Sequence, residues 1–227
     1  MVVVQKIVQP ALNTVTPLRD EARRRLLAAI LLEVPFTGWT PVSLRAAAAR
    51  LGEAPSLVER LFPAAIPEVL EFWSHLTDAA MTQWLAGEEC RGMRTQERAE
   101  AAILRRLDEL ALNREAARLA MQQLSFPHLN GGSGLGLKLV TRTVDELWHG
   151  LGDCSTDFNW YSKRLLMAGV YLPAIVYWLS PAAPQREEIA ALIQRQMERI
   201  TDLSRLGKAL RSRSEGLITR LQPRLRA

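Results

Sequence analysis

Residues 40–52 read Thr-Pro-Val-Ser-Leu-Arg-Ala-Ala-Ala-Ala-Arg-Leu-Gly, and residues 56–62 read Ser-Leu-Val-Glu-Arg-Leu-Phe. Thr40 and Pro41 form an N-cap and first-turn proline pair, which is a typical helix start, and Gly52 stands where that helix should end. The second segment follows after a short turn and is long enough for a short helix. Together the two segments predict a helix-turn-helix near the N-terminus.

Similar helix-starting and helix-ending residues recur along the rest of the chain, with Thr16-Pro17 as a further N-cap and first-turn proline pair and Gly87 at a further helix end. The expected helices span Leu18–Val34, Val42–Leu51, Ser56–Phe62 and Pro67–Ala86, and others begin at Thr95, Asn113, Ser133, Thr156 and Pro184. Alternating strand patterns are absent from the sequence. We therefore predict an all-α fold of about nine or ten helices, with Leu129 to Gly136 as its loosest loop.

The composition is that of a folded globular protein that needs neither disulfides nor metal. The chain has 227 residues, of which 48% are hydrophobic and 23% charged. Its two cysteines and three histidines lack metal-ligand spacing, and no nucleophile elbow is present. The glycine-rich run at 131–136 lacks the preceding strand and the Gly-Lys-Ser/Thr ending of a phosphate loop. We expect no metal, no cofactor and no enzymatic activity.

No stretch of the sequence predicts a membrane span or a targeting segment. The longest uncharged stretch, 165–184, is apolar only as far as Leu179 and contains Pro173. It is shorter than the roughly 20 apolar residues that cross a bilayer, so it predicts a buried helix. Residues 1–15 lack the apolar run of a signal peptide and the arginines of a transit peptide, and we expect a flexible N-terminus there.

Positive charge is concentrated at the C-terminal end. Residues 195–227 hold nine basic and three acidic residues, whereas the rest of the chain has a net charge of −1. Five leucines form a narrow apolar stripe among these basic residues, as in a helix that lies in a membrane interface. The predicted membrane-binding residues are Leu203, Leu206, Leu210, Leu217, Leu221, Lys208 and Arg211. A solvated helix docked on its own protein remains the alternative.

The helix-turn-helix segment carries little charge for binding DNA. In its second helix Arg60 is balanced by Glu59, and Glu53, Glu68 and Glu71 lie close by in the sequence. Contacts of basic residues with phosphates dominate the affinity of proteins for DNA. We therefore expect the segment to have kept the helix-turn-helix fold and lost the ability to bind DNA.

The helix expected after Gly152 carries tryptophan, tyrosine and arginine in its first turns, and these residue types dominate interface hot spots. One stripe, at i, i+3, i+4 and i+7, is formed by Asp157, Trp160, Tyr161 and Arg164. Phe158 and Leu165 then begin the opposite, inward face. From the spacing alone, a core position for the two aromatic residues is favoured over a partner surface.

Beyond Leu165 the same helix is apolar nearly all round, which is typical of a central helix. Such a helix lines a pocket for a long apolar ligand wherever its neighbours leave room. The predicted lipid-binding residues are Leu166, Val170, Tyr171, Ile175 and Trp178.

This helix also carries a resemblance to a known family. Gly152-Asp153, Ser-Thr-Asp-Phe-Asn-Trp-Tyr at 155–161, Lys163-Arg164 and Ala-Gly-Val-Tyr at 168–171 are similar to the most characteristic stretch of the coenzyme Q biosynthesis accessory proteins of the Coq-nine type. Those are lipid-binding proteins with a TetR-like fold. Further similar segments lie at 34–36, 38–40, 61–63 and 142–148, so the match covers roughly residues 18–205. Residues 40–62 also resemble the N-terminal domain of TetR-type regulators, with Glu59 where a tyrosine is usual.

The resemblance implies a lipid-binding accessory protein that binds isoprenoid quinone intermediates and presents them to the di-iron hydroxylase of ubiquinone biosynthesis. It implies that the aromatic stripe is a docking patch for that enzyme rather than core. The implied partner-binding residues are Asp157, Asn159, Trp160, Tyr161 and Arg164. It favours a membrane-binding terminal helix. The implied location is peripheral to the bacterial inner membrane, or to the matrix side of the mitochondrial inner membrane in a eukaryote.

Four parts are expected along the chain: a flexible N-terminus (1–15), a degenerate helix-turn-helix-like segment (16–66), a helical lipid-binding domain (67–200) and a basic amphipathic tail (201–227). The expected partners are an isoprenoid quinone lipid, the hydroxylase, a membrane surface and a second copy of the chain, but no nucleic acid. The alternative is a TetR-type ligand-responsive transcriptional regulator, in which the same pocket receives an effector.

Overall fold

The computed structural model describes residues 2–126, 132–153 and 158–200, and in these ranges the chain is helical with no strand. The helices are α1 (Val2–Thr37), α2 (Pro41–Arg50), α3 (Ser56–Leu61), α4 (Ile66–Leu85), the short 3-10 helix η1 (Glu88–Cys90), α5 (Thr95–Ala111), α6 (Arg114–Ser125), α7 (Gly132–Gly150) and α8 (Phe158–Trp178). Residues 186–200 form a further helical stretch. The predicted all-α class is confirmed.

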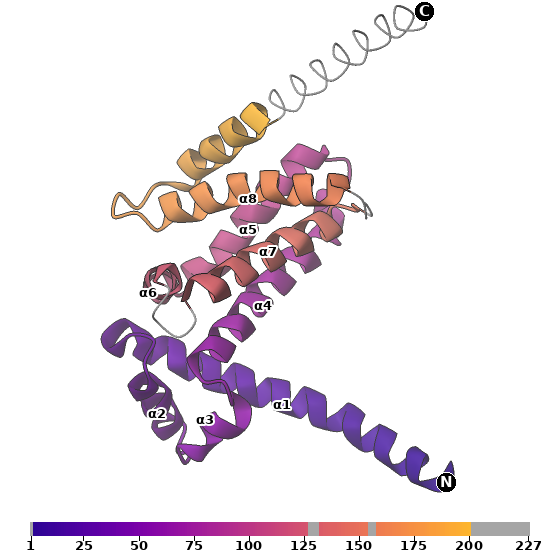
Figure 1. Cartoon of the computed structure of the whole chain (residues 1–227), viewed down its shortest axis with the longest axis vertical. Coiled ribbons are helices and arrows are strands. Elements are labelled where there is room, and N and C mark those ends of the chain that lie inside the picture. The colour runs from indigo at the N-terminus through magenta and orange to yellow at the C-terminus, as the bar shows by residue number, and fades with distance from the viewer. Residues whose placement is uncertain (1, 127–131, 154–157, 201–227) are drawn as a thin grey trace, which may run out of the picture.

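The first three helices lie together at one end of the molecule (Figure 1). Thr40 caps α2: its Oγ1 accepts a hydrogen bond from the Ser43 backbone, and its own N–H donates to Ser43 Oγ at 3.3 Å. Gly52 ends the following turn with a positive φ of 73°, which glycine adopts without strain. Thr40 and Gly52 thus start and end this part of the helix-turn-helix segment as the sequence predicts.

The start of α1 differs from the prediction. The helix begins at Val2 rather than at Leu18, and Pro17 lies inside it. A Thr-Pro pair marks a helix start only where the preceding residues leave the helix, and here they continue it. The Thr16-Pro17 pair therefore misled the sequence-based assignment of the helix boundary.

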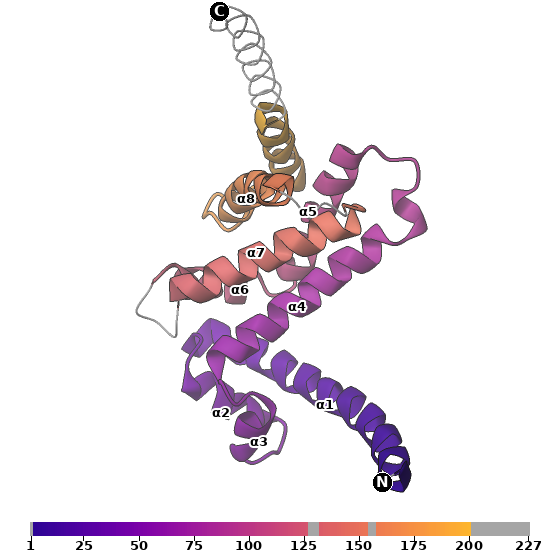
Figure 2. The ribbon, with the colours of Figure 1, turned by 45° about the vertical axis from the view of Figure 1, so that its right-hand side comes forward.

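Helix α4 connects the N-terminal helices to the rest of the bundle. Figures 1 and 2 show it leading from α1–α3 toward a second group formed by α5, α7 and α8, with the helical residues 186–200 beside α8. Trp39 and Trp73 pack with ring centroids 5.6 Å apart, and Trp39 Nε1 donates to the backbone oxygen of Ala116 at 3.0 Å. The hydrophobic core is therefore continuous from Leu26 to Met197.

The glycine-rich segment is partly helical, so the prediction of a loop as far as Gly136 was wrong. Residues 132–136 form the first turns of α7, and 129–131 lie outside the described residues. A Cβ at Gly136 would lie 3.2 Å from the backbone oxygen of Leu124. Glycine at this position therefore allows α7 to approach the end of α6 closely. The glycine-rich composition of the segment does not distinguish such a helix start from a loop.

Within the described ranges, no helix combines the length and the apolar character that crossing a bilayer requires.

Candidate functional site

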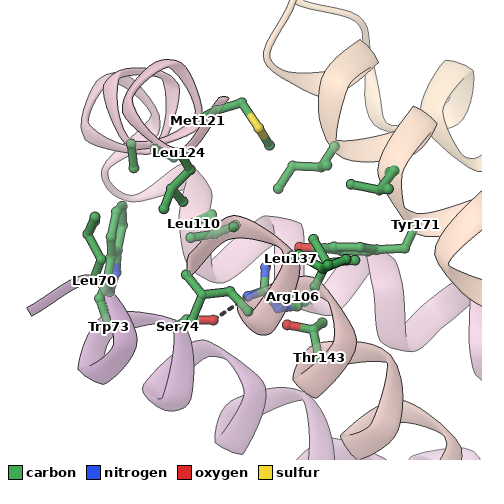
Figure 3. A pocket seen from close by; sticks show the side chains of 17 residues that line it. Leu70, Trp73, Ser74, Arg106, Leu110, Met121, Leu124, Leu137, Thr143 and Tyr171 are labelled. Atoms are coloured by element: carbon green, nitrogen blue, oxygen red, sulfur yellow. Dashed lines mark hydrogen bonds between the residues drawn. The ribbon is translucent and has the colours of Figure 1, made fainter. Parts of the chain in front are cut away.

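An apolar cavity of about 340 Å³ lies among α4, α5, α6, α7 and α8 (Figure 3). This volume is at the lower end of the range typical of small-molecule sites. The lining side chains are mostly aliphatic or aromatic; they come from Leu70, Trp73, Ser74, Arg106, Leu110, Ala117, Ala120, Met121, Leu124, Gly136, Leu137, Leu139, Val140, Thr143, Tyr171, Leu172 and Ile175. The cavity suits a ligand, or part of one, that is largely hydrocarbon.

The cavity reaches the surface beside Leu137 of α7 and Leu172 of α8. Leu137 on α7 is 70% exposed and Leu172 on α8 is 39% exposed, yet both line the cavity. Exposed leucines on a cavity rim leave apolar surface in contact with water until a ligand covers them. This rim is the site of the opening.

The predicted lipid-binding residues fall on two faces of α8. Tyr171 and Ile175 line the cavity, whereas Leu166, Val170 and Trp178 are not among its lining residues. Val170 and Trp178 are buried in the core, and Leu166 is half-buried. Because α8 is apolar nearly all round, its sequence does not reveal which face meets the cavity.

Sequence reasoning missed the walls contributed by the other helices. Trp73 on α4, Leu110 on α5 and Leu124 on α6 line the same cavity as Tyr171. Each of these residues has the pattern of an ordinary core position in its own helix. No local signal identifies them as cavity residues, since the cavity exists only after the helices pack.

One side of the cavity carries a buried polar cluster, which consists of Ser74, Asp78, Arg106, Thr143 and Tyr171. Arg106 Nε donates to Asp78 Oδ1 at 2.7 Å, Nη1 to the Tyr171 hydroxyl at 2.6 Å and Nη2 to Ser74 Oγ at 3.1 Å. Thr143 Oγ1 donates to Asp78 Oδ1 at 2.9 Å. The side chains of Arg106 and Asp78 are 5% and 1% exposed. The cluster therefore joins α4, α5, α7 and α8 inside the protein.

The neighbours of Arg106 keep it charged. Burial alone lowers its pKa, but Tyr171, Asp78 and the hydrogen bond to Asp78 outweigh this effect and raise the pKa above its ordinary value. Burial also raises the pKa of Tyr171, with Arg106 opposing and Asp78 adding to the shift. The Tyr171 hydroxyl therefore keeps its proton at neutral pH. Asp78 Oδ2 is buried and has no hydrogen-bond partner among the described residues.

The predicted partner-binding residues are described only in part. Asp157 lies outside the described residues, as do the side chains of Asn159, Trp160 and Tyr161. Arg164 is 9% exposed; its Nε donates to Asp145 Oδ1 at 2.6 Å, and its Nη1 lies 3.8 Å from Asp153 Oδ2. The guanidinium thus ties α8 to α7 and to the segment that follows α7. Its role in partner binding stays a prediction.

The expected inward position of Leu165 was wrong, because its side chain is 75% exposed. The adjacent Arg164 turns inward instead, toward the carboxylates of Asp145 and Asp153. Hydrophobicity alone predicts that the leucine is buried and the arginine exposed. The observed arrangement is explained by the acidic partners of the arginine, which lie in another segment.

The predicted membrane-binding residues, Leu203, Leu206, Leu210, Leu217, Leu221, Lys208 and Arg211, all lie outside the described residues. Among those described, no group of three or more histidine, cysteine, aspartate or glutamate side chains is arranged to hold a metal ion. His75 contacts Arg142 Nη2 on α7, and Glu71 pairs with Lys138 at 2.6 Å. These pairs link α4 to α7 at the surface.

Comparison with known proteins confirms the resemblance seen in the sequence. The COQ9 family model matches residues 134–204. The ubiquinone biosynthesis protein COQ9 of Homo sapiens, which is mitochondrial, is 26% identical over 206 residues, a match that covers 88% of this chain and 64% of that protein. The protein of the same name from Bos taurus is 27% identical over 206 residues, covering 88% and 63%. This chain therefore matches somewhat less than two thirds of the length of these relatives.

A solved structure shares the fold. The TetR transcriptional regulator from Nitrosomonas europaea superposes with a TM-score of 0.62 at 17% sequence identity, covering 79% of this chain and 97% of that one. At this identity the likeness speaks for the fold alone. The predicted TetR-like architecture is confirmed.

Proposed function

We propose, on the basis of the similarity to COQ9 proteins over most of the chain, that this protein is a non-enzymatic accessory protein of ubiquinone biosynthesis. It binds isoprenoid quinone intermediates at a membrane surface and presents them to the di-iron hydroxylase. Lipid binding is supported by the apolar cavity, whose rim carries the exposed Leu137 of α7 and Leu172 of α8.

The size of the cavity sets what part of such a ligand it holds. Burying hydrocarbon contributes about 0.8 kcal/mol per methylene, so two isoprene units supply about 8 kcal/mol before the costs of association. A cavity of about 340 Å³ holds only part of a long isoprenoid quinone. The remainder extends through the opening beside Leu137 and Leu172.

Native mass spectrometry of the protein, purified from a host that makes quinones, tests this function directly. We expect the folded protein to retain a ligand that is released on denaturation and identified as a prenylated ring compound. The reason is that an isoprenoid tail leaves an apolar cavity slowly in water. Retention of phospholipid or fatty acid alone would contradict the assignment of the ligand class.

Hydroxylase docking at the start of α8 is part of the same proposal. Trp160 and the cavity-lining Tyr171 are eleven residues apart on one helix, which corresponds to about 16 Å. A partner seated on the first turns of α8 would thus lie within reach of a ligand that leaves the cavity. A second copy of the chain is a further proposed partner, through late helices such as α8, which exposes Leu165 and Val176 away from the cavity lining.

The basic tail is the proposed membrane anchor. Deleting the chain after Thr201 is expected to abolish binding to anionic liposomes and leave the helical body folded, because the leucine stripe and most of the surplus positive charge are lost together. Flotation with vesicles measures the binding, and circular dichroism reports the fold.

A double variant, Leu206→Glu with Leu210→Glu, keeps the basic residues and separates the leucine stripe from charge alone. We expect it to lose most of the binding, because glutamates on the stripe oppose insertion. Undiminished flotation of the truncated protein would place the membrane site elsewhere on the molecule.

The TetR-like fold supports the alternative function, a transcriptional regulator, but the recognition helix that such a regulator needs is not basic in this chain. Glu59 and Arg60 are both exposed on the six-residue α3, and Glu68 pairs with Arg23 at 2.8 Å. One exposed arginine balanced by one glutamate gives this helix almost no attraction for phosphates. We therefore favour lipid binding over DNA binding.

A further inference from the structure

The polar cluster inside an otherwise apolar cavity points to the chemistry of the ligand's head, an inference that rests on the proposed function. Burying a polar group costs free energy unless the group is hydrogen-bonded. A cavity that holds only hydrocarbon therefore does not require an arginine and a tyrosine in its wall. Arg106 and Tyr171 both line the cavity, together with Ser74 and Thr143 (Figure 3).

The cluster presents more donors than acceptors. A guanidinium carries five N–H groups, and those of Arg106 make three hydrogen bonds, one each from Nε, Nη1 and Nη2. Nη1 and Nη2 therefore each keep one N–H without an acceptor among the described residues. The oxygen of Tyr171 accepts from Arg106, and its own proton likewise has no acceptor in the described part of the chain. Asp78 Oδ2 is an acceptor of the cluster without a partner among the described residues, but Asp78 does not line the cavity, so the groups still to be satisfied at the cavity wall are donors.

The charge of the cluster is already balanced. The Arg106 guanidinium is paired with the Asp78 carboxylate at 2.7 Å, and the nearby Tyr171 is a neutral phenol. An anionic head such as a phosphate would enter a site whose only cation in the cluster is neutralised, and it would lose its hydration without a free counter-charge. A neutral head with acceptor oxygens meets the spare donors without this cost.

We propose that the polar cluster binds the neutral, oxygen-bearing ring of the ligand, with Tyr171 and Arg106 donating to a ring carbonyl or ether oxygen. The apolar walls opposite, including Trp73 and Leu124, cover the ring and the first part of the tail. The ligand is held with its ring inward, and its transfer to a partner requires the ring to move out through the opening beside Leu137 and Leu172.

Two matched probes distinguish the contribution of the ring oxygens to affinity from that of the tail. They are a 1,4-benzoquinone with a geranyl tail, and geranylbenzene, which has the same tail and no oxygen. Tyr171→Phe removes one donor and keeps the ring, so we expect it to weaken quinone binding about five- to tenfold and geranylbenzene binding less than twofold. Tyr177→Phe is the control, because Tyr177 lies on the same helix, is half-buried and does not line the cavity. It should change neither affinity.

The infrared spectrum of the bound quinone gives a second readout. Hydrogen bonds from the cluster should lower the carbonyl stretching frequency relative to the same quinone in a hydrocarbon solvent, and Tyr171→Phe should reduce this shift. An unshifted carbonyl band, or equal weakening of both probes by Tyr171→Phe, would overturn the inference and leave the proposed function intact.

A third probe, geranyl phosphate, tests the balance of charge. It should compete more weakly than the geranyl quinone, and stronger competition would overturn the assignment of a neutral head. Failure of both the quinone and geranylbenzene to bind the wild-type protein would instead contradict the proposed function itself.

Discussion

Replacing Arg106 with methionine is expected to lower the free energy of unfolding by about 3–5 kcal/mol, because the Asp78 carboxylate would then be buried without its cation. For a chain of this size, such a loss lowers the melting temperature by about 6–20 °C. The change also leaves the Tyr171 hydroxyl and Ser74 Oγ without their donor. Thermal and denaturant unfolding measure the effect.

The neighbouring arginine is the matched control. Arg105 has a 44% exposed side chain and pairs with Glu109 one turn along α5, so Arg105→Met should cost less than about 0.5 kcal/mol. A double variant, Asp78→Leu with Arg106→Met, removes both charges and should regain most of the lost stability. Equal melting temperatures for the Arg105 and Arg106 variants would show that the buried pair does not stabilise the fold as the geometry indicates.

Filling the cavity is expected to have the largest effect on ligand binding. Ala120 on α6 is 6% exposed and lines the cavity, so Ala120→Phe places a ring where about one isoprene unit would lie. Excluding about five carbons forfeits about 4 kcal/mol of burial, which predicts a loss of affinity for prenylated ligands of about 700-fold. Titration with the geranyl quinone measures this loss.

The same substitution at an exposed site controls for added hydrophobicity. Ala111 is exposed at the end of α5, and Ala111→Phe should leave the affinity unchanged. Thermal unfolding must show that Ala120→Phe remains folded, since overpacking typically costs 1–3 kcal/mol where no space exists. Wild-type affinity in a folded Ala120→Phe variant would place the ligand outside this cavity.

Local signals in the sequence predicted the helices well. The Thr40-Pro41 start of α2 and the expected beginnings at Thr95 and Asn113 agree with the structure to within one residue. Caps and turn residues act through backbone groups a few positions away, so their effect is visible in a short stretch of sequence. The start of α1 was wrong for the same reason, because Thr16-Pro17 has the local form of a cap inside a continuous helix.

The candidate site depends on contacts that no short stretch contains. Arg106 meets Asp78 across 28 residues of sequence and Tyr171 across 65, and nothing around Arg106 distinguishes it from the exposed Arg105 beside it. The predicted cavity residues Tyr171 and Ile175 came from the apolar character of α8, which also selected Leu166, Val170 and Trp178. Only the packing of neighbouring helices decides which face of α8 remains uncovered.

The walls of the cavity differ in how firmly they are fixed. Four of its five helices share the polar cluster, whereas the side-chain hydrogen bonds that link α6 to other segments in the described part of the chain lie near its start, where Trp39 donates to Ala116 O and Arg114 donates to Trp178 O. The second half of α6, with Met121 and Leu124, is held instead by apolar packing, which includes its close approach to Gly136 of α7. Substitutions there offer a route to change the tail length that the protein accepts without disturbing the frame that holds the ring.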